Sequence, residues 1–107
     1  MTYRVTIVSA AKQQMARQAL WWSENRSAEQ AARWLAGLDT ALQSLEVHPE
    51  RCSLARESEA FDIDLCELRY GLSDKPTHRA IFEIRGDEVI VYAIRHVAQH
   101  DIEPGDL

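Results

Sequence analysis

The feature that most constrains this 107-residue chain is an uninterrupted apolar seam in its first half. Successive members of the seam are four, three, four and three residues apart: Ala31, Leu35, Leu38, Leu42 and Leu45. This spacing places all five side chains on one face of an α-helix. Ser27 followed by Gln30 is a capping-box pattern that predicts where the helix starts, and His48-Pro49 predicts where it ends.

A second helical stretch precedes the seam. Strong helix formers follow Ser9, which we expect to be the N-cap, and apolar residues recur at helical spacing: Ala11, Met15, Ala19 and Trp22. The polar turn Asn25-Arg26-Ser27 joins the two helices into an antiparallel hairpin. Such a hairpin cannot enclose a core alone, so it must pack against a sheet. We expect Trp22 and Trp34 to lie in that contact and Trp21 to be partly exposed.

Alternating stretches predict the strands of this sheet. They cover Tyr3–Val8, Ile63–Gly71 and a hairpin from Thr77 to His96 that turns at Gly86-Asp87. The intervening residues 49–62 show no periodicity and are expected to form an ordered surface loop. The predicted fold class is α+β, in the order β-α-α-β-β-β, with a helical hairpin packed on one face of a mainly antiparallel sheet. Residues 1–107 are expected to form a single domain.

The last hairpin ends on polar side chains, and its register decides where they point. A two-residue turn pairs Arg85 with Glu88, Phe82 with Val91 and Arg79 with Ile94. One face then carries the core residues Phe82, Ile84, Val89, Val91 and Ala93, and the other carries Arg79, Ile81, Glu83, Tyr92, Ile94 and His96. We expect this second face to lie open, with His96 opposite Thr77 and diagonal to Arg79.

An arginine and a histidine placed in this way could hold a phosphate and move a proton. The simpler interpretation is structural, because strand ends are often polar. In that case Arg69 and Arg79 are ion-pair partners of Glu67 or Glu83, and this interpretation is favoured from the residues alone.

Composition narrows the function classes. The formal net charge of −5 disfavours wholesale binding to nucleic-acid backbones and suits a basic partner. No apolar run is long enough for a membrane span and the N-terminus lacks a signal-peptide pattern, so we expect a cytoplasmic protein. Cys52 and Cys66 fit no zinc spacing and are expected to be reduced, a disulfide being the less favoured alternative. His96 and His100 are four residues apart, but we predict no metal site and no cofactor.

Four segments resemble, in order and with similar spacing, the RelE/ParE superfamily of toxins from type II toxin–antitoxin systems: YRVTIVSAAKQQM, AEQAARWLAGLDTALQSLEVHPERC, ELRYG and HRAIFEIRGDEVIVYAIRHVAQHD. The chain is most similar to the ParE-type branch, also called plasmid stabilisation proteins, through HPERCSLARESE and IRHVAQ. The resemblance implies a small toxin that a cognate antitoxin wraps and neutralises, in a toxin–antitoxin hetero-oligomer.

The two branches imply different targets. Relatives similar to ParE poison DNA gyrase, whereas relatives similar to RelE cleave messenger RNA in the ribosomal A site. For the nuclease, the resemblance implies that His96 carries the proton, that Arg69 and Arg79 hold phosphate, and that Arg95 lies beside them. The tail after His96 offers no Tyr or Lys, although His100 could compensate.

The acidic charge and the presence of only two lysines favour a ParE-like gyrase poison that inhibits growth. An endoribonuclease similar to RelE is the alternative, and an inactive homologue that only binds an antitoxin is the second alternative.

Overall fold

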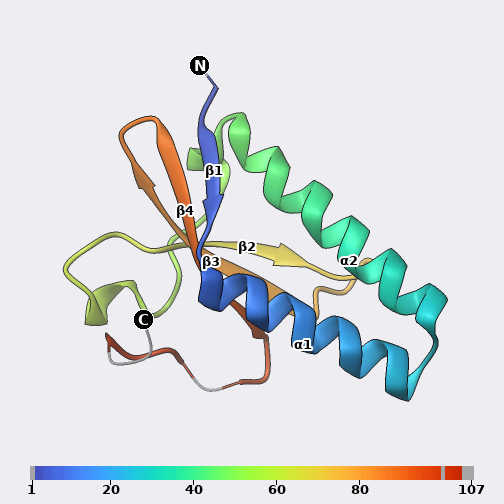
Figure 1. Cartoon of the computed structure of the whole chain (residues 1–107). Helices are drawn as coiled ribbons and strands as arrows, with labels where there is room; N and C mark the ends of the chain where they lie inside the picture. The colour runs from blue at the N-terminus through green and yellow to red at the C-terminus, as the bar shows by residue number, and fades with distance from the viewer. Residues whose placement is uncertain (1, 100, 105–107) are drawn as a thin grey trace.

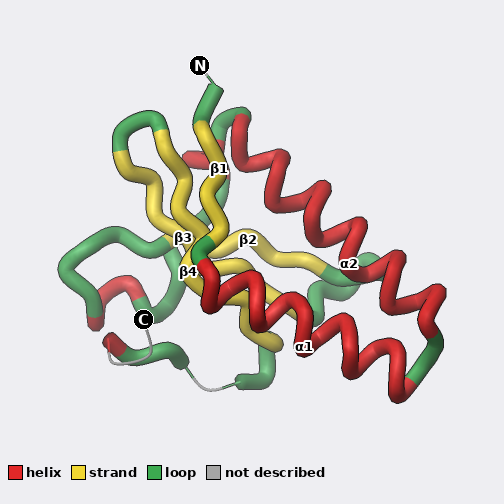
Figure 2. The backbone as a smooth tube through the Cα atoms, in the orientation of Figure 1, coloured by secondary structure: helices red, strands yellow, loops and turns green. Residues whose placement is uncertain are grey.

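The computed structural model describes residues 2–99 and 101–104, and it has the predicted order of elements. Figures 1 and 2 show strand β1 (Arg4–Ile7), helices α1 (Ser9–Asn25) and α2 (Ala28–Gln43), and strands β2 (Cys66–Tyr70), β3 (His78–Arg85) and β4 (Glu88–His96). Three short 3₁₀ helices lie between α2 and β2: η1 (Ser44–Glu46), η2 (Pro49–Arg51) and η3 (Ser58–Ala60). The fold is α+β, as the sequence predicts.

The strands form one mixed sheet in the order β1-β4-β3-β2. β1 runs parallel to β4, and the other neighbouring pairs are antiparallel. The antiparallel helical hairpin of α1 and α2 packs against one face of this sheet (Figure 1). β1 pairs only with residues 88–91 of β4. Along the same edge, the rest of β4 has no neighbouring strand among the described residues, and α1 contacts β4.

The helical seam forms the larger core, with one change from the prediction. Trp34, Leu38, Leu42 and Leu45 are almost completely buried against Phe82, Val89 and Val91, whereas Leu35 is 37% exposed. The burial of Trp34 confirms the prediction for that residue, whereas the prediction that Leu35 lies in the core is wrong. The Ser27 side chain caps α2 by accepting a bond from the Gln30 N–H, as predicted.

The predicted cap of α1 is wrong by one residue. Ser9 is the first helical residue, and the N-cap position is Val8, which has no side-chain oxygen to accept a bond. Val8 instead continues the direction of β1, and its N–H donates to Val91 O of β4. The pairing of β1 with β4 therefore determines where the helix begins.

The second face of the sheet is covered, which corrects the prediction of an open face. A smaller core of Ala55, Leu65, Ile81, Ala93 and Ile102 lies there, with Phe61, Ile63 and Tyr92 packed against it. Figure 1 shows the segment between α2 and β2 and the C-terminal segment on the side of the sheet away from the helices. Residues 53–62 contain no helix or strand other than the short 3₁₀ helix η3, so their apolar side chains show no period in the sequence, and the strand predicted over Ile63–Gly71 begins only at Cys66.

The register of the β3–β4 hairpin is as predicted near the turn and different beyond it. Arg85 pairs with Glu88 and Phe82 with Val91, but Ile81 pairs with Ala93. Tyr92 is therefore an extra residue, a β-bulge, and every later side chain of β4 changes face. Arg79 lies opposite Arg95 rather than Ile94, and His96 lies opposite His78 rather than Thr77. Accordingly Ala93 belongs to the second core and Ile94 to the helix-side core.

Among the described residues, no helix is both long and apolar enough to cross a lipid bilayer. Cys52 and Cys66 are free thiols.

Candidate functional site

The sheet arginine that sequence reasoning singled out is closed in a buried ion cluster. Arg79 is 2% exposed, and its Nη1 donates to Glu57 Oε1 at 2.7 Å and to Glu67 Oε1 at 3.3 Å. Its Nη2 also bonds Glu57 Oε2, which accepts the Ile102 N–H at 3.2 Å. Burial alone would raise the pKa of Glu57, but the hydrogen bonds from Arg79 and Ile102 outweigh it and lower the pKa to about 2. The cluster therefore fastens both the loop and the tail to β3.

The other predicted site residues do not join Arg79 in an accessible group. Arg69 is exposed, and its Nε donates to Glu67 Oε2 at 2.8 Å, so it reaches the cluster only through a shared carboxylate. Arg95 lies opposite Arg79 in the ladder. His96 turns toward the helices. The expected diagonal contact between His96 and Arg79 on one open face is thus wrong, whereas the catalytic roles of these residues stay a prediction.

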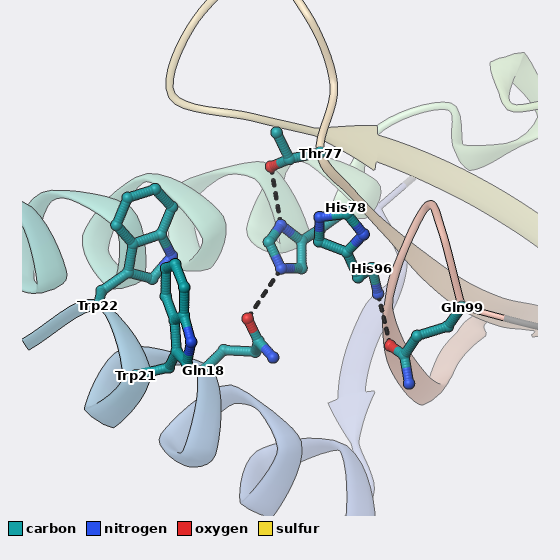
Figure 3. A pocket seen from close by; sticks show the side chains of 7 residues that line it. All are labelled: Gln18, Trp21, Trp22, Thr77, His78, His96 and Gln99. Atoms are coloured by element: carbon teal, nitrogen blue, oxygen red, sulfur yellow. Dashed lines mark hydrogen bonds between the residues drawn. The ribbon is translucent and has the colours of Figure 1, made fainter. Parts of the chain in front are cut away.

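His96 lines a pocket that the sequence did not indicate. The pocket has a volume of about 390 Å³ and lies between the C-terminal half of α1 and the ends of β3 and β4 (Figure 3). Its walls come from three segments: Gln18, Trp21 and Trp22 of α1, Thr77 and His78 at the start of β3, and His96 and Gln99 at the end of β4. Trp21 is 46% exposed, which confirms the prediction that this tryptophan is partly exposed.

His78 is the central buried polar group of this pocket. It is 2% exposed, and its Nδ1 lies 2.8 Å from Thr77 Oγ1 and its Nε2 3.1 Å from Gln18 Oε1. Its ring packs edge-to-face on Trp34 and on His96, with centroids 5.1 Å away in both cases. Burial, and secondarily the His96 charge, lowers the pKa of His78 to about 4. The imidazole is therefore neutral near pH 7, with Nε2–H donating to Gln18 and Nδ1 accepting from Thr77.

A smaller polar pocket of about 130 Å³ adjoins the first one. Gln18 and Gln99 line both pockets, and Gln14, Arg17, Ile94 and Arg95 complete the second. The pair of pockets therefore joins aromatic walls to two guanidinium groups. The sequence offers only local signals for this site, the Trp21-Trp22 dipeptide and the Thr77-His78 pair at the start of β3, and neither indicates that the two lie together.

The part of the chain that the structure describes holds no cluster of three or more His, Cys, Asp or Glu side chains suited to a metal ion. The His96–His100 pair considered from the sequence includes a residue outside the described ones.

Comparison with known proteins places this fold in a defined group. A family model described as the ParE toxin of type II toxin–antitoxin systems, parDE, matches residues 5–100. No curated protein sequence matches the chain.

Two solved structures share the fold at low sequence identity. The chain is similar to a chain of the chromosomal ParDE toxin–antitoxin system from P. aeruginosa, with a TM-score of 0.71, 14% identity, and coverage of 90% of this chain and 97% of that one. It is also similar to a chain of the toxin–antitoxin complex RelBE2 from Mycobacterium tuberculosis, with a TM-score of 0.55, 19% identity, and coverage of 90% and 99%.

Proposed function

The chain belongs to the ParE toxin family of type II toxin–antitoxin systems, and on that premise we propose that it inhibits growth by poisoning DNA gyrase and that a cognate antitoxin neutralises it. The family match over residues 5–100 is the observation that carries this proposal. Gyrase acts on DNA in the cytoplasm, which is the compartment expected for this protein.

The closed state of Arg79 favours gyrase over messenger RNA as the target. A nuclease that cleaves through an attacking ribose hydroxyl needs cationic groups that can reach the phosphate. Arg79 is instead buried and bonded to two carboxylates, under a loop and the C-terminal segment. Releasing it would leave Glu57 as a buried carboxylate without a cationic partner and Glu67 with Arg69 alone, which costs several kcal/mol. The net charge of −5 adds a further unfavourable term for approach to ribosomal RNA.

Exposed apolar side chains support a protein partner. Leu20, Trp21, Leu35 and Val97 are between 37% and 59% exposed. An antitoxin segment that covers such side chains would remove them from water, and tryptophan is a frequent anchor in interfaces of this kind. The names of both similar structures describe toxin–antitoxin systems, which agrees with a hetero-oligomer of this toxin and its antitoxin.

Two assays with the purified protein separate the hypotheses. A gyrase poison should halt supercoiling and accumulate linear DNA in the presence of purified gyrase. A relative of RelE should instead produce codon-phased cuts of messenger RNA in a translation extract. The proposal predicts the first result and no cuts in the second assay. Inactivity in both assays, together with tight binding of the antitoxin encoded beside the gene, would favour an inactive homologue.

A further inference from the structure

The pocket beside α1 is a slot with aromatic walls on opposite sides. Figure 3 shows the Trp21 and Trp22 rings on one side, the His78 and His96 rings on the other, and the Gln18 side chain between them. The two indoles meet at 86° with centroids 5.4 Å apart, so they form a corner rather than a flat wall. A volume of about 390 Å³ falls within the range of small-ligand pockets. The shape suits a flat ring system.

Hydrogen bonds within the walls use acceptor atoms and leave several donors of the lining residues without a partner among the described residues. Gln18 uses its Oε1 on His78, and Gln99 uses its Oε1 to accept the His96 N–H at 2.7 Å. Each amide therefore keeps its NH₂ group for a further partner. His96 Nδ1 accepts the Ala98 N–H at 3.0 Å, which leaves the proton of the neutral ring on Nε2. The Trp22 indole N–H is buried with no hydrogen-bond partner among the described residues. A ligand matched to these groups carries acceptors on its ring edges.

The adjoining pocket adds positive charge. Arg17 and Arg95 line it, and Gln18 and Gln99 connect it to the aromatic slot. Among the described residues, no Asp or Glu lines either pocket. Guanidinium groups bind phosphate oxygens through charge-assisted hydrogen bonds. The whole site therefore selects a planar, acceptor-rich ring joined to an anionic group.

We propose that this site binds a nucleotide unit, with the base between the Trp21–Trp22 corner and the two imidazoles and the phosphate on Arg17. Base stacking on tryptophan and arginine contact with phosphate are the two interactions that such a unit offers. A hydrocarbon ring such as that of phenylalanine would fill the slot but leave the amide and imidazole donors unpaired, which disfavours it. Both a free nucleotide and an unpaired nucleotide in a single strand present this chemistry.

Isothermal titration calorimetry with GMP tests the proposal, because guanine presents two acceptors, N7 and O6, on one edge. GMP should bind saturably, and guanosine, which lacks the phosphate, should bind at least about tenfold more weakly. Trp21→Ala should weaken GMP binding by about tenfold or more, which is the contribution of one stacked base. Leu20→Ala is the matched control, because Leu20 is the exposed neighbour of Trp21 and lines neither pocket.

Arg17→Gln provides a second test that does not depend on the aromatic wall. It should weaken GMP binding by about tenfold and leave guanosine binding unchanged. Arg33→Gln is its control, because Arg33 is an exposed arginine of α2 outside both pockets. Circular dichroism melts of all four variants establish that each is folded before it is titrated.

A single-stranded deoxynucleotide octamer of alternating T and G distinguishes the two sources. Binding at least tenfold tighter than that of GMP identifies a strand as the ligand, and equal or weaker binding identifies the free nucleotide. Absence of saturable binding by both probes at millimolar concentration would overturn the proposal. So would binding that Trp21→Ala and Arg17→Gln leave unchanged, or saturation by the tripeptide Glu-Phe-Glu alone, which would point to a protein partner. None of these outcomes depends on activity against gyrase.

Discussion

At the scale of single residues, the Arg79 cluster determines how the second face of the sheet is closed. One guanidinium on β3 bonds Glu57 from the covering loop and Glu67 from β2, and Glu57 in turn accepts the Ile102 N–H from the C-terminal segment. A buried ion group contributes little compared with a well-packed apolar one, but removing one partner leaves uncompensated charge. Arg79 is therefore the side chain whose removal should loosen the loop and the C-terminal segment together, although both also pack on the second core.

Arg79→Ala should lower the free energy of unfolding by about 3–5 kcal/mol, because it leaves the buried Glu57 carboxylate without a cation and removes one of the two guanidinium partners of Glu67. The matched control is Arg69→Ala, which removes an exposed guanidinium from the same Glu67. This control should cost at most about 1 kcal/mol. Urea unfolding of the two variants measures the difference, and equal losses would contradict the description of the cluster as buried and tightly coupled.

His78 makes the fold sensitive to mild acid. Its pKa is about 4 in the folded chain and 6.5 ordinarily. Between these pH values the unfolded chain binds a proton that the folded chain does not, so the free energy of unfolding decreases as the pH falls. The full loss corresponds to about 3 kcal/mol.

An NMR titration of the His78 ring tests this prediction directly, and His78→Asn should flatten the decline in stability between pH 6.5 and 4. A midpoint near 6.5 for His78 in the folded protein would show that the ring is hydrated and that the pocket wall is open.

At the scale of elements, the Tyr70 side chain of β2 occupies the space next to Gly37 of α2 that a side chain at this position would need. A Cβ added there would lie 2.2 Å from Tyr70 Oη, which donates to Trp34 O at 2.9 Å. A glycine inside a helix is normally a weakness, costing about 1 kcal/mol relative to alanine. Here it allows the tyrosine to satisfy a helix carbonyl and to join the two layers.

Gly37→Ala should therefore fail to stabilise the protein, because the gain in helix propensity is cancelled by displacement of Tyr70. In a Tyr70→Phe background the shortest clash is absent, so the same substitution should be more favourable by at least about 1 kcal/mol. Thermal or urea unfolding of the four proteins in this double-mutant cycle gives the coupling. Additive effects within about 0.3 kcal/mol would exclude the contact.

The elements also show what a sequence pattern can and cannot predict. The Leu38, Leu42 and Leu45 seam and the Ser27 cap are periodic or local signals, and both were found. The bulge at Tyr92 leaves no mark in the sequence pattern of β4. Both faces of the sheet are buried, so apolar residues follow one another on either side of the extra residue between Val91 and Ala93. Because of this extra residue, His96 lies on the helix side of the sheet and not on the face where it was predicted to lie beside Arg79.

The pocket was missed for a related reason. Gln18 belongs to α1 and lies 60 residues from His78, so only the tertiary arrangement brings them together. The covering loop was missed as a core element because Ala55 and Phe61 pack from backbone without a regular strand or α-helix, which leaves no period.

At the scale of the whole molecule, the chain has the fold of the ParE toxin family, and the described residues cover both faces of its sheet. Helices close one face of the sheet, and the loop and tail close the other. The acidic net charge of −5 favours recognition of a protein target or partner over recognition of a phosphate backbone. The nucleotide site proposed beside α1 is local and small, and it is compatible with this overall charge.

The measurement that tests this account most directly is DNA cleavage by purified gyrase in the presence of the purified protein. The account predicts that protein-linked linear DNA accumulates in proportion to the amount of the protein added, and that the cognate antitoxin abolishes the effect. Arg69→Ala, which removes an exposed candidate of the nuclease hypothesis, should retain the full effect. Unchanged supercoiling, combined with codon-phased messenger RNA cuts that Arg69→Ala abolishes, would contradict the account.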